Sequence, residues 1–141
     1  MLIRAFAVVL LAVGAFPAAA LDLTDQGVYA VVHRDGHVTS KHIRLMRIGE
    51  EWIAKDADDQ SQAENCPVCV LKPSTSAEVE QFMGGPAPAG MAAECAHNNS
   101  MAICRITEGQ APEVSRQYGF VALTQSRPVY LKLVRVPAGA P

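Results

Sequence analysis

The chain has 141 residues, of which 12 are Lys or Arg and 14 are Asp or Glu, so its formal net charge at pH 7 is −2. A slightly acidic chain argues against nucleic acid or an anionic membrane surface as the main partner, because both attract basic proteins. The length suits one domain with a modest hydrophobic core.

The first 20 residues have the three parts of a secretory signal peptide. Arg4 supplies the positive charge, the segment 5–16 is apolar or small throughout, and Pro17 precedes alanines at 18–20 that suit signal peptidase. A transmembrane anchor is the competing interpretation, but a membrane span needs about 20 apolar residues and this run is shorter. We therefore expect cleavage after Ala20, a periplasmic or secreted protein, and no membrane contact after cleavage.

Cleavage there also defines the folded unit. Because Arg4 is one of the 12 basic residues, the mature chain keeps 11 against 14 acidic residues, which makes its net charge −3. Residues 21–136 are predicted to form a single globular domain. The Pro-Ala-Gly-Ala-Pro sequence at 137–141 has nothing to bury and is predicted to be a mobile tail.

The mature chain begins with the pattern of a β-hairpin. Gly27–Val32 is a run of β-branched and aromatic residues, and the Asp-Gly pair at 35–36 is a strong turn signal before a second strand over 37–48. In this second strand the apolar residues change phase near Leu45 and Met46. Such a change predicts a β-bulge at that point.

The middle of the chain is predicted to contain a strand and a helix. A short strand over 51–55 carries the only tryptophan and leads into a polar, acidic loop over 56–64. Residues 77–83 have the apolar spacing of a short helix, with N-cap candidates at 73–76 and a Gly-Gly-Pro sequence at 84–86 to end it.

Three further strands are predicted in the last third of the chain, over 101–107, 118–123 and 129–136. The second of them is apolar on both faces, which indicates a central position in a sheet. The fold class that follows is α+β with β dominant: an antiparallel sheet, open or curled into a small barrel, with one short helix and stabilising disulfides.

Four cysteines in an exported chain predict two disulfides. The sequence Cys66-Pro67-Val68-Cys69 suits a type I turn, which brings its end Cα atoms within about 7 Å. The segment 97–100 has the composition of a hairpin tip, so Cys95 and Cys104 would face each other across two strands. We favour the pairs Cys66–Cys69 and Cys95–Cys104, and a crossed pairing is the alternative.

Redox catalysis and zinc binding are less favoured roles for these cysteines. A reactive CxxC pair owes its low thiol pKa to the start of a helix, and Pro73 follows too soon after Cys69 for a long helix. The spacing C-x2-C-x25-C-x8-C also lacks the second close pair of a zinc ribbon. A structural role with no cofactor is the expectation.

A copper site remains as an alternative to a purely structural role. Soft and imidazole ligands of the kind that suit Cu(I) gather within eleven residues, at Met91, Cys95, His97 and Met101. The simpler interpretation treats the methionines as core residues and His97 as a polar residue of a hairpin tip.

Hydrolytic chemistry has little support in the sequence. The four histidines, His33, His37, His42 and His97, stand in neither a G-x-S-x-G nor an H-E-x-x-H motif. His33 and His37 bracket the predicted hairpin turn and are interpreted as solvated turn residues. No catalytic residue is therefore expected.

A basic strip on the predicted second strand is the strongest functional signal. It contains Lys41, His42, Arg44 and Arg47, with Trp52 close by in sequence. Because Trp and Arg are enriched at interface hot spots, these residues predict a surface that binds another protein. The alternative is a solvated sheet face with Trp52 in the core.

The expected function is that of an exported, non-catalytic binding protein, for example an inhibitor of, or an immunity protein against, a cell-envelope enzyme. Its expected partner is another protein in the periplasm or the extracellular space. A copper-handling or thiol-redox accessory protein is the alternative.

Overall fold

The structure is a computed structural model that describes residues 21–58, 66–108 and 115–137. The predicted signal peptide lies outside the described residues, as do residues 59–64 of the predicted acidic loop and residues 138–141 of the predicted tail.

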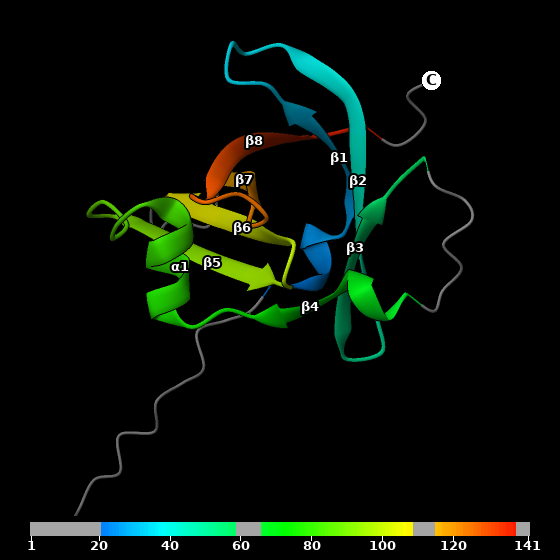
Figure 1. Cartoon of the computed structure of the whole chain (residues 1–141), viewed down its shortest axis with the longest axis horizontal. Coiled ribbons are helices and arrows are strands. Elements are labelled where there is room, and N and C mark those ends of the chain that lie inside the picture. The colour runs from blue at the N-terminus through cyan, green and yellow to red at the C-terminus, as the bar shows by residue number, and fades with distance from the viewer. Residues whose placement is uncertain (1–20, 59–65, 109–114, 138–141) are drawn as a thin grey trace, which may run out of the picture.

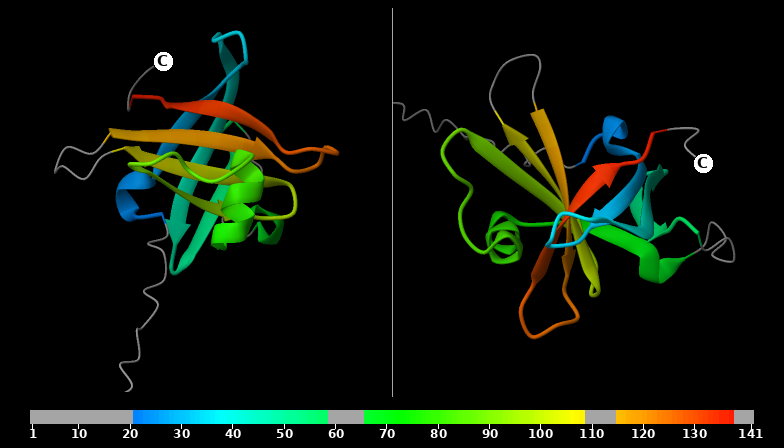
Figure 2. Two further views of the ribbon diagram at one scale, coloured as in Figure 1. Left: turned by 90° about the vertical axis from the view of Figure 1, so that its left-hand side faces the viewer. Right: turned by 90° about the horizontal axis from the view of Figure 1, so that it is seen from above.

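Eight antiparallel strands form a closed barrel in which each strand pairs with the next and β8 pairs with β1 (Figures 1 and 2). The predicted β-dominant fold is therefore confirmed, in its barrel form. The strands are β1 (Gly27–Val32), β2 (Val38–Ile48), β3 (Glu51–Asp56), β4 (Val70–Pro73), β5 (Met91–His97), β6 (Met101–Glu108), β7 (Ser115–Ala122) and β8 (Val129–Arg135).

The barrel interior is filled by side chains, as expected for eight strands. Tyr29, Leu45 and Ile103 have an exposed fraction of 1% or less and lie at the centre of the main hydrophobic cluster. This cluster takes residues from every strand: Tyr29, Val31, Ile43, Leu45, Trp52, Ala54, Leu71, Ala96, Ile103, Tyr118, Phe120 and Leu133, with Leu21 from the segment before β1.

The predicted helix is present as α1 (Ser76–Met83), and its local signals explain both ends. The Thr75 hydroxyl accepts a hydrogen bond from the Glu78 N–H at 3.2 Å, and the Glu78 carboxylate accepts one from the Thr75 N–H at 2.9 Å, which is a capping box. Gly84 ends the helix with a φ of +79°, a conformation that glycine adopts without strain.

α1 covers part of the outer face of the barrel (Figure 1). Its Phe82 side chain is buried in a second hydrophobic cluster with Cys95, Ala102, Cys104 and Val121 of the strands below. The interior and exterior clusters together explain why β6 and β7 are apolar on both faces.

β7 pairs along β6 in eight residue pairs and along β8 in five. Every strand of a closed barrel has two neighbours, so the central position predicted for 118–123 corresponds only to this pairing on both sides. Gly119 in the middle of β7 leaves room for the Tyr130 ring of β8. A Cβ atom at this position would overlap the ring, so the glycine is required by the close approach of the tyrosine.

Both favoured disulfides are confirmed, and the crossed pairing is not formed. Cys66 and Cys69 bracket a short 3-10 turn, η2 (Pro67–Cys69), with a Cα–Cα distance of 5.2 Å. Cys95 and Cys104 stand directly opposite each other on β5 and β6, with a Cα–Cα distance of 4.1 Å. Disulfides of this kind fit an oxidising compartment.

The bulge predicted near Leu45 and Met46 is wrong. The ladder between β2 and β3 runs without a shift through both residues, and the register shift lies instead between Ala30 and Val32, where β1 pairs with the start of β2. The apolar phase changes because β2 continues beyond Leu45, where its pairing with β1 ends. Ile48 lies in this extension and is exposed.

A short 3-10 helix, η1 (Leu23–Asp25), packs across one end of the barrel. The Tyr29 hydroxyl of β1 donates a hydrogen bond to the Asp25 carbonyl, and Arg135 of β8 donates one to the Thr24 carbonyl at 2.8 Å. Asp25 itself has an exposed fraction of 0%, so a charged residue of η1 is enclosed by the strands.

Candidate functional site

The basic residues predicted to form one strip divide between the two faces of β2. Ile43 and Leu45 point into the core, so Lys41 and Arg47 share their side of the strand, whereas His42 and Arg44 point to the other side. The Lys41 ammonium lies 5.5 Å from the centre of the Phe120 ring, at the mouth of the barrel. The four side chains therefore do not form a continuous surface.

Trp52 is not available at the surface. Its side chain belongs to the barrel interior and has an exposed fraction of 5%. Position 52 shares the inward face of β3 with Ala54, since side chains two residues apart lie on the same side of a strand. The ring therefore stabilises the core, which corrects its predicted place beside the basic strip.

The residues proposed as copper ligands also lie apart. Cys95 is in a disulfide, Met101 packs against the barrel interior, and Met91 lies on the outer face at the opposite end of β5 from His97. Met91 and His97 are six residue steps apart on an extended strand, or about 20 Å, which is far more than one metal ion bridges.

The Cys66–Cys69 turn leads into β4 and not into a helix. A helix N-terminus is what lowers the pKa of the first cysteine in redox-active CxxC motifs. Cys66 caps only the single 3-10 turn η2, with no α-helix after it, and the disulfide closes this turn.

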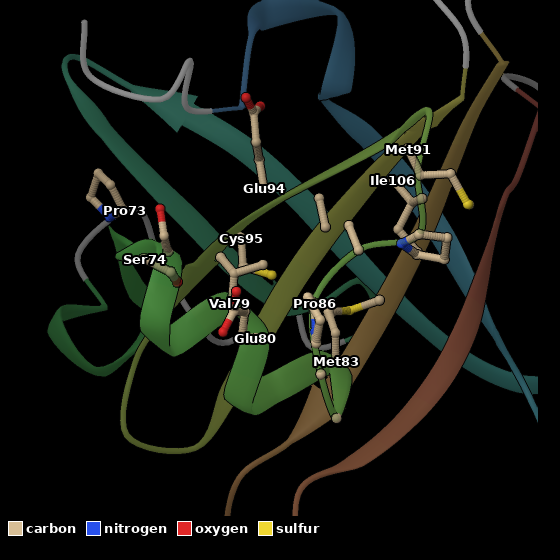
Figure 3. A pocket seen from close by; sticks show the side chains of 16 residues that line it. Pro73, Ser74, Val79, Glu80, Met83, Pro86, Met91, Glu94, Cys95 and Ile106 are labelled. Carbon is tan, nitrogen blue, oxygen red and sulfur yellow. The ribbon is translucent and has the colours of Figure 1, made fainter. Parts of the chain in front are cut away.

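A groove of about 460 Å³ lies between α1 and the outer face of β5 and β6 (Figure 3). Its walls are apolar. Val79 and Met83 of α1 form one wall, and Met91 of β5 and Ile106 of β6 form the other, with Pro86 from the connecting loop at one end. The groove was not predicted from the sequence, because it forms only where α1 lies across β5 and β6, and Met91 was considered only as a copper ligand or a core residue.

The groove reaches an edge of β5 that is only partly paired. β5 pairs with β6 in seven residue pairs but with β4 in only two. The Ser74 N–H donates to the Cys95 carbonyl at 2.9 Å on the β4 side. Because alternate residues of an antiparallel strand direct their backbone groups to the same side, Ala93 directs its N–H and carbonyl there as well. Within the described ranges, no strand lies in register with Ala93 on that side.

Two acidic residues border the groove, but the carboxylate of Glu94 belongs to the charged cluster around Arg105 on the other face of β5. Glu94 points away from α1 in Figure 3 and accepts a hydrogen bond from the buried Arg105, so its charge is compensated. Glu80 is exposed on the rim. The groove therefore offers apolar walls, backbone hydrogen-bonding groups and a slightly acidic rim.

Ser74, His97 and Glu78 meet at one end of the groove without forming a catalytic triad. The Ser74 hydroxyl is 2.8 Å from His97 Nδ1, and the nearest Glu78 oxygen is 3.7 Å from the same nitrogen. A triad needs the nucleophile and the acid on opposite ring nitrogens, so that the histidine relays a proton. Here both groups approach one nitrogen, and the contacts fasten α1 to the end of β5.

A group of charges lies at the end of the barrel that η1 covers. Arg105 Nη1 donates to Asp25 at 2.5 Å and to Asp22 at 3.1 Å, while its other amino group donates to Glu94. The Tyr118 hydroxyl donates to Asp25 at 2.8 Å. Arg105 and Asp25 are buried, whereas the Asp22 side chain is 46% exposed and that of Glu94 is 23% exposed. The buried Arg105–Asp25 pair therefore closes the barrel end, although the Nε of Arg105 has no hydrogen-bond partner among the described residues.

Comparison with protein-family models, with curated proteins and with solved structures finds no match for this chain. No helix in residues 21–58, 66–108 and 115–137 has the length and apolar character needed to cross a bilayer. The groove and the open edge of β5 therefore carry the functional argument by themselves.

Proposed function

We propose that this chain is a periplasmic or secreted, non-catalytic binding protein that holds an extended segment of another protein in the groove between α1 and β5. The single observation that carries the proposal is the partly paired edge of β5 beside an apolar groove. A partner of this kind would be the enzyme recognised by an inhibitor or an immunity protein.

An extended segment suits both halves of this surface. Unpaired N–H and carbonyl groups at a sheet edge bind a further strand through its backbone, and adjacent pockets accept alternate side chains of that strand. A volume of about 460 Å³ also lies within the range of about 300–1,000 Å³ that is usual for ligand pockets. Exposed Glu80 on the rim favours a segment with a basic residue beside its apolar anchors.

The accessory functions considered from the sequence have weaker support. The copper set is dispersed over both faces of the barrel, and the Cys66–Cys69 turn has no helix after it. Both disulfides fit the oxidising compartment that export would provide.

A substitution of Ala93 by proline tests the edge. Proline removes the N–H that faces away from β6, and edge strands tolerate it because that group is not used in the ladder. We expect peptides of about ten residues, selected by display on the purified protein, to bind Ala93→Pro at least tenfold more weakly, since one lost hydrogen bond costs about 1 kcal/mol and the ring also blocks the edge. The measurement is a titration of one selected peptide against both proteins.

Amide exchange and two charge substitutions complete the test. The Ala93 amide should exchange more slowly when the peptide is bound, and Met83→Asp should weaken binding because it places a charge in the apolar wall. The matched control is Ile48→Asp, which alters an exposed apolar residue at the end of β2 and should bind normally. Equal affinity of the wild-type and Ala93→Pro proteins, with both folded, would reject this site. A dimer that Ala93→Pro abolishes would assign the edge to a second copy instead.

A further inference from the structure

We propose that the tip of the β1–β2 hairpin is a binding site for a divalent transition metal of the Zn²⁺ type, formed by His33, Asp35 and His37. Within the described part of the chain, one ligand atom from each residue lies within 4.8 Å of the other two. From the sequence, His33 and His37 were interpreted as solvated turn residues, and Asp35 was not considered as a third ligand.

The backbone of the hairpin places the two histidines side by side. The His33 N–H donates to the His37 carbonyl at 2.8 Å, and the Gly36 N–H donates to the His33 carbonyl at 2.9 Å. Residues opposite each other across a hairpin project their side chains to the same face. The two imidazole rings accordingly have centres 5.9 Å apart.

Asp35 lies at the turn between them and is held in place. Its Oδ1 accepts a hydrogen bond from the His37 N–H at 3.0 Å. This hydrogen bond fixes the carboxylate beside the two imidazole rings. Gly36 allows the tight turn with a φ of +90°, in which a side chain would be strained.

The two separations between Asp35 and the histidines suit a shared ion better than direct hydrogen bonds, and the ligand atoms of the two histidines lie within 4.8 Å of each other. Asp35 Oδ1 is 3.4 Å from Nδ1 of His33 and 3.4 Å from Nδ1 of His37. Good hydrogen bonds between such atoms span about 2.7–3.2 Å. In a tetrahedral zinc site with bonds of about 2.0–2.1 Å, neighbouring ligand atoms lie about 3.3–3.4 Å apart.

The ligand set defines the class of metal. Two imidazole nitrogens and one carboxylate oxygen suit Zn²⁺ or Cu²⁺, whereas Mg²⁺ and Ca²⁺ prefer oxygen ligands throughout. All three side chains are 60–66% exposed, so an ion reaches them directly and water completes its coordination. The hairpin extends beyond the barrel in Figures 1 and 2, well apart from the groove beside α1, so this inference does not rest on the proposed function.

Calorimetric titration of the purified protein, free of any histidine tag, with ZnCl₂ tests the site. We expect one Zn²⁺ per chain with micromolar affinity and no binding of Mg²⁺ under the same conditions. Loss of one ligand, in His33→Ala or His37→Ala, should weaken Zn²⁺ binding by at least about tenfold. These residues are exposed, so the variants should keep the circular dichroism of the wild type.

Two variants serve as matched controls. Arg34→Ala changes the same hairpin tip without removing a ligand, and His42→Ala removes a histidine elsewhere on β2. Both should bind Zn²⁺ as the wild type does. In NMR spectra the ring signals of His33 and His37 should shift with Zn²⁺ while those of His42 and His97 stay in place.

Three outcomes would overturn the proposal. The first is the absence of saturable binding with Zn²⁺ up to about 1 mM, where the standard binding free energy is only about −4 kcal/mol. The second is an equal loss of affinity in His42→Ala and His37→Ala, which would place the ion elsewhere. The third is Zn²⁺ binding that leaves the ring signals of His33 and His37 unchanged.

Discussion

At the scale of single residues, Asp25 shows what the sequence could not reveal. It stands in a short polar segment before the first strand and has no local signal of burial. The structure encloses it completely, because Arg105 and Tyr118 supply partners from strands 80 and 93 residues further along the chain. Charge pairing over such distances becomes visible only when the barrel has closed.

Replacement of Asp25 by asparagine should strongly destabilise the barrel. The substitution keeps the size of the side chain but leaves Arg105 without its buried carboxylate partner. We expect a loss of about 3 kcal/mol in the free energy of unfolding, the lower part of the range for a broken buried ion pair, because Glu94 and Asp22 still compensate Arg105. Urea denaturation followed by circular dichroism measures it.

Asp22→Asn is the graded control for that experiment. The Asp22 side chain is 46% exposed, and asparagine preserves the cap of η1, so the expected loss is below about 1 kcal/mol. A hydrogen bond from Thr24 is the main reason why the pKa of Asp22 lies below its usual value, so its contribution is present at neutral pH and declines as the pH falls through the folded-state pKa. An equal loss in the free energy of unfolding of both variants would show that the burial of Asp25 does not increase its contribution to stability.

The residues of the predicted basic strip also differ in what the sequence could reveal about them. Positions 41 and 47 fall on one side of a strand and positions 42 and 44 on the other, as period-two alternation requires. This division was available from the sequence alone. The burial of Trp52 was not, because it depends on which face of β3 turns toward the barrel axis.

At the scale of elements, the sequence predicts those with strong local signals. α1 has a capping box and a terminal glycine, and β1 has a β-branched run ended by a turn. β4 was missed because it has only four residues, which follow the disulfide-bonded turn directly and end with Pro73. β5 is rich in alanine, and it forms a strand because β6 and the Cys95–Cys104 bridge hold it there.

Replacement of Thr75 by alanine tests the capping box of α1. The variant loses the hydroxyl that accepts the Glu78 N–H, and the usual cost of such a change is about 1 kcal/mol. The cap stabilises α1, which lies outside the barrel. The loss of stability should therefore appear as faster amide exchange in α1 before any change in the barrel strands. Ser76→Ala, one residue further along, should stay within about 0.5 kcal/mol of the wild type. Uniform acceleration of exchange throughout the chain would instead mean that α1 and the barrel unfold together.

At the scale of the whole molecule, barrel closure and the groove arise from non-local contacts. The sequence allows either an open sheet or a barrel, and the choice is made by four residue pairs between β1 and β8, the first and last strands. The groove exists because α1 lies across β5 and β6 while β4 is too short to cover the rest of β5. Neither the closure of the barrel nor the formation of the groove can be predicted from a local sequence pattern.

The three tyrosines of the chain allow the barrel to be tested as one cooperative unit. Tyr29 and Tyr118 lie in the interior and Tyr130 lies on the outer face. Burial raises the pKa of all three phenols above the value of about 10 that tyrosine has in an unfolded chain. A raised folded-state pKa contributes stability that is complete below pH 10 and is lost as the pH rises further.

We therefore expect no separate tyrosine ionisation near pH 10. Phenolate absorbance should instead appear at higher pH, in a single step that coincides with the loss of circular dichroism, because the phenols ionise when the barrel opens. Tyr130→Phe should reduce the absorbance change by one third without splitting that step. If a phenol ionised near pH 10 while the circular dichroism stayed native, that tyrosine would be accessible in the folded protein. If Tyr130→Phe lost this early ionisation step, the accessible phenol would be Tyr130, on the outer face beside α1. If the variant kept the early step, the accessible phenol would be Tyr29 or Tyr118, at the barrel end closed by η1.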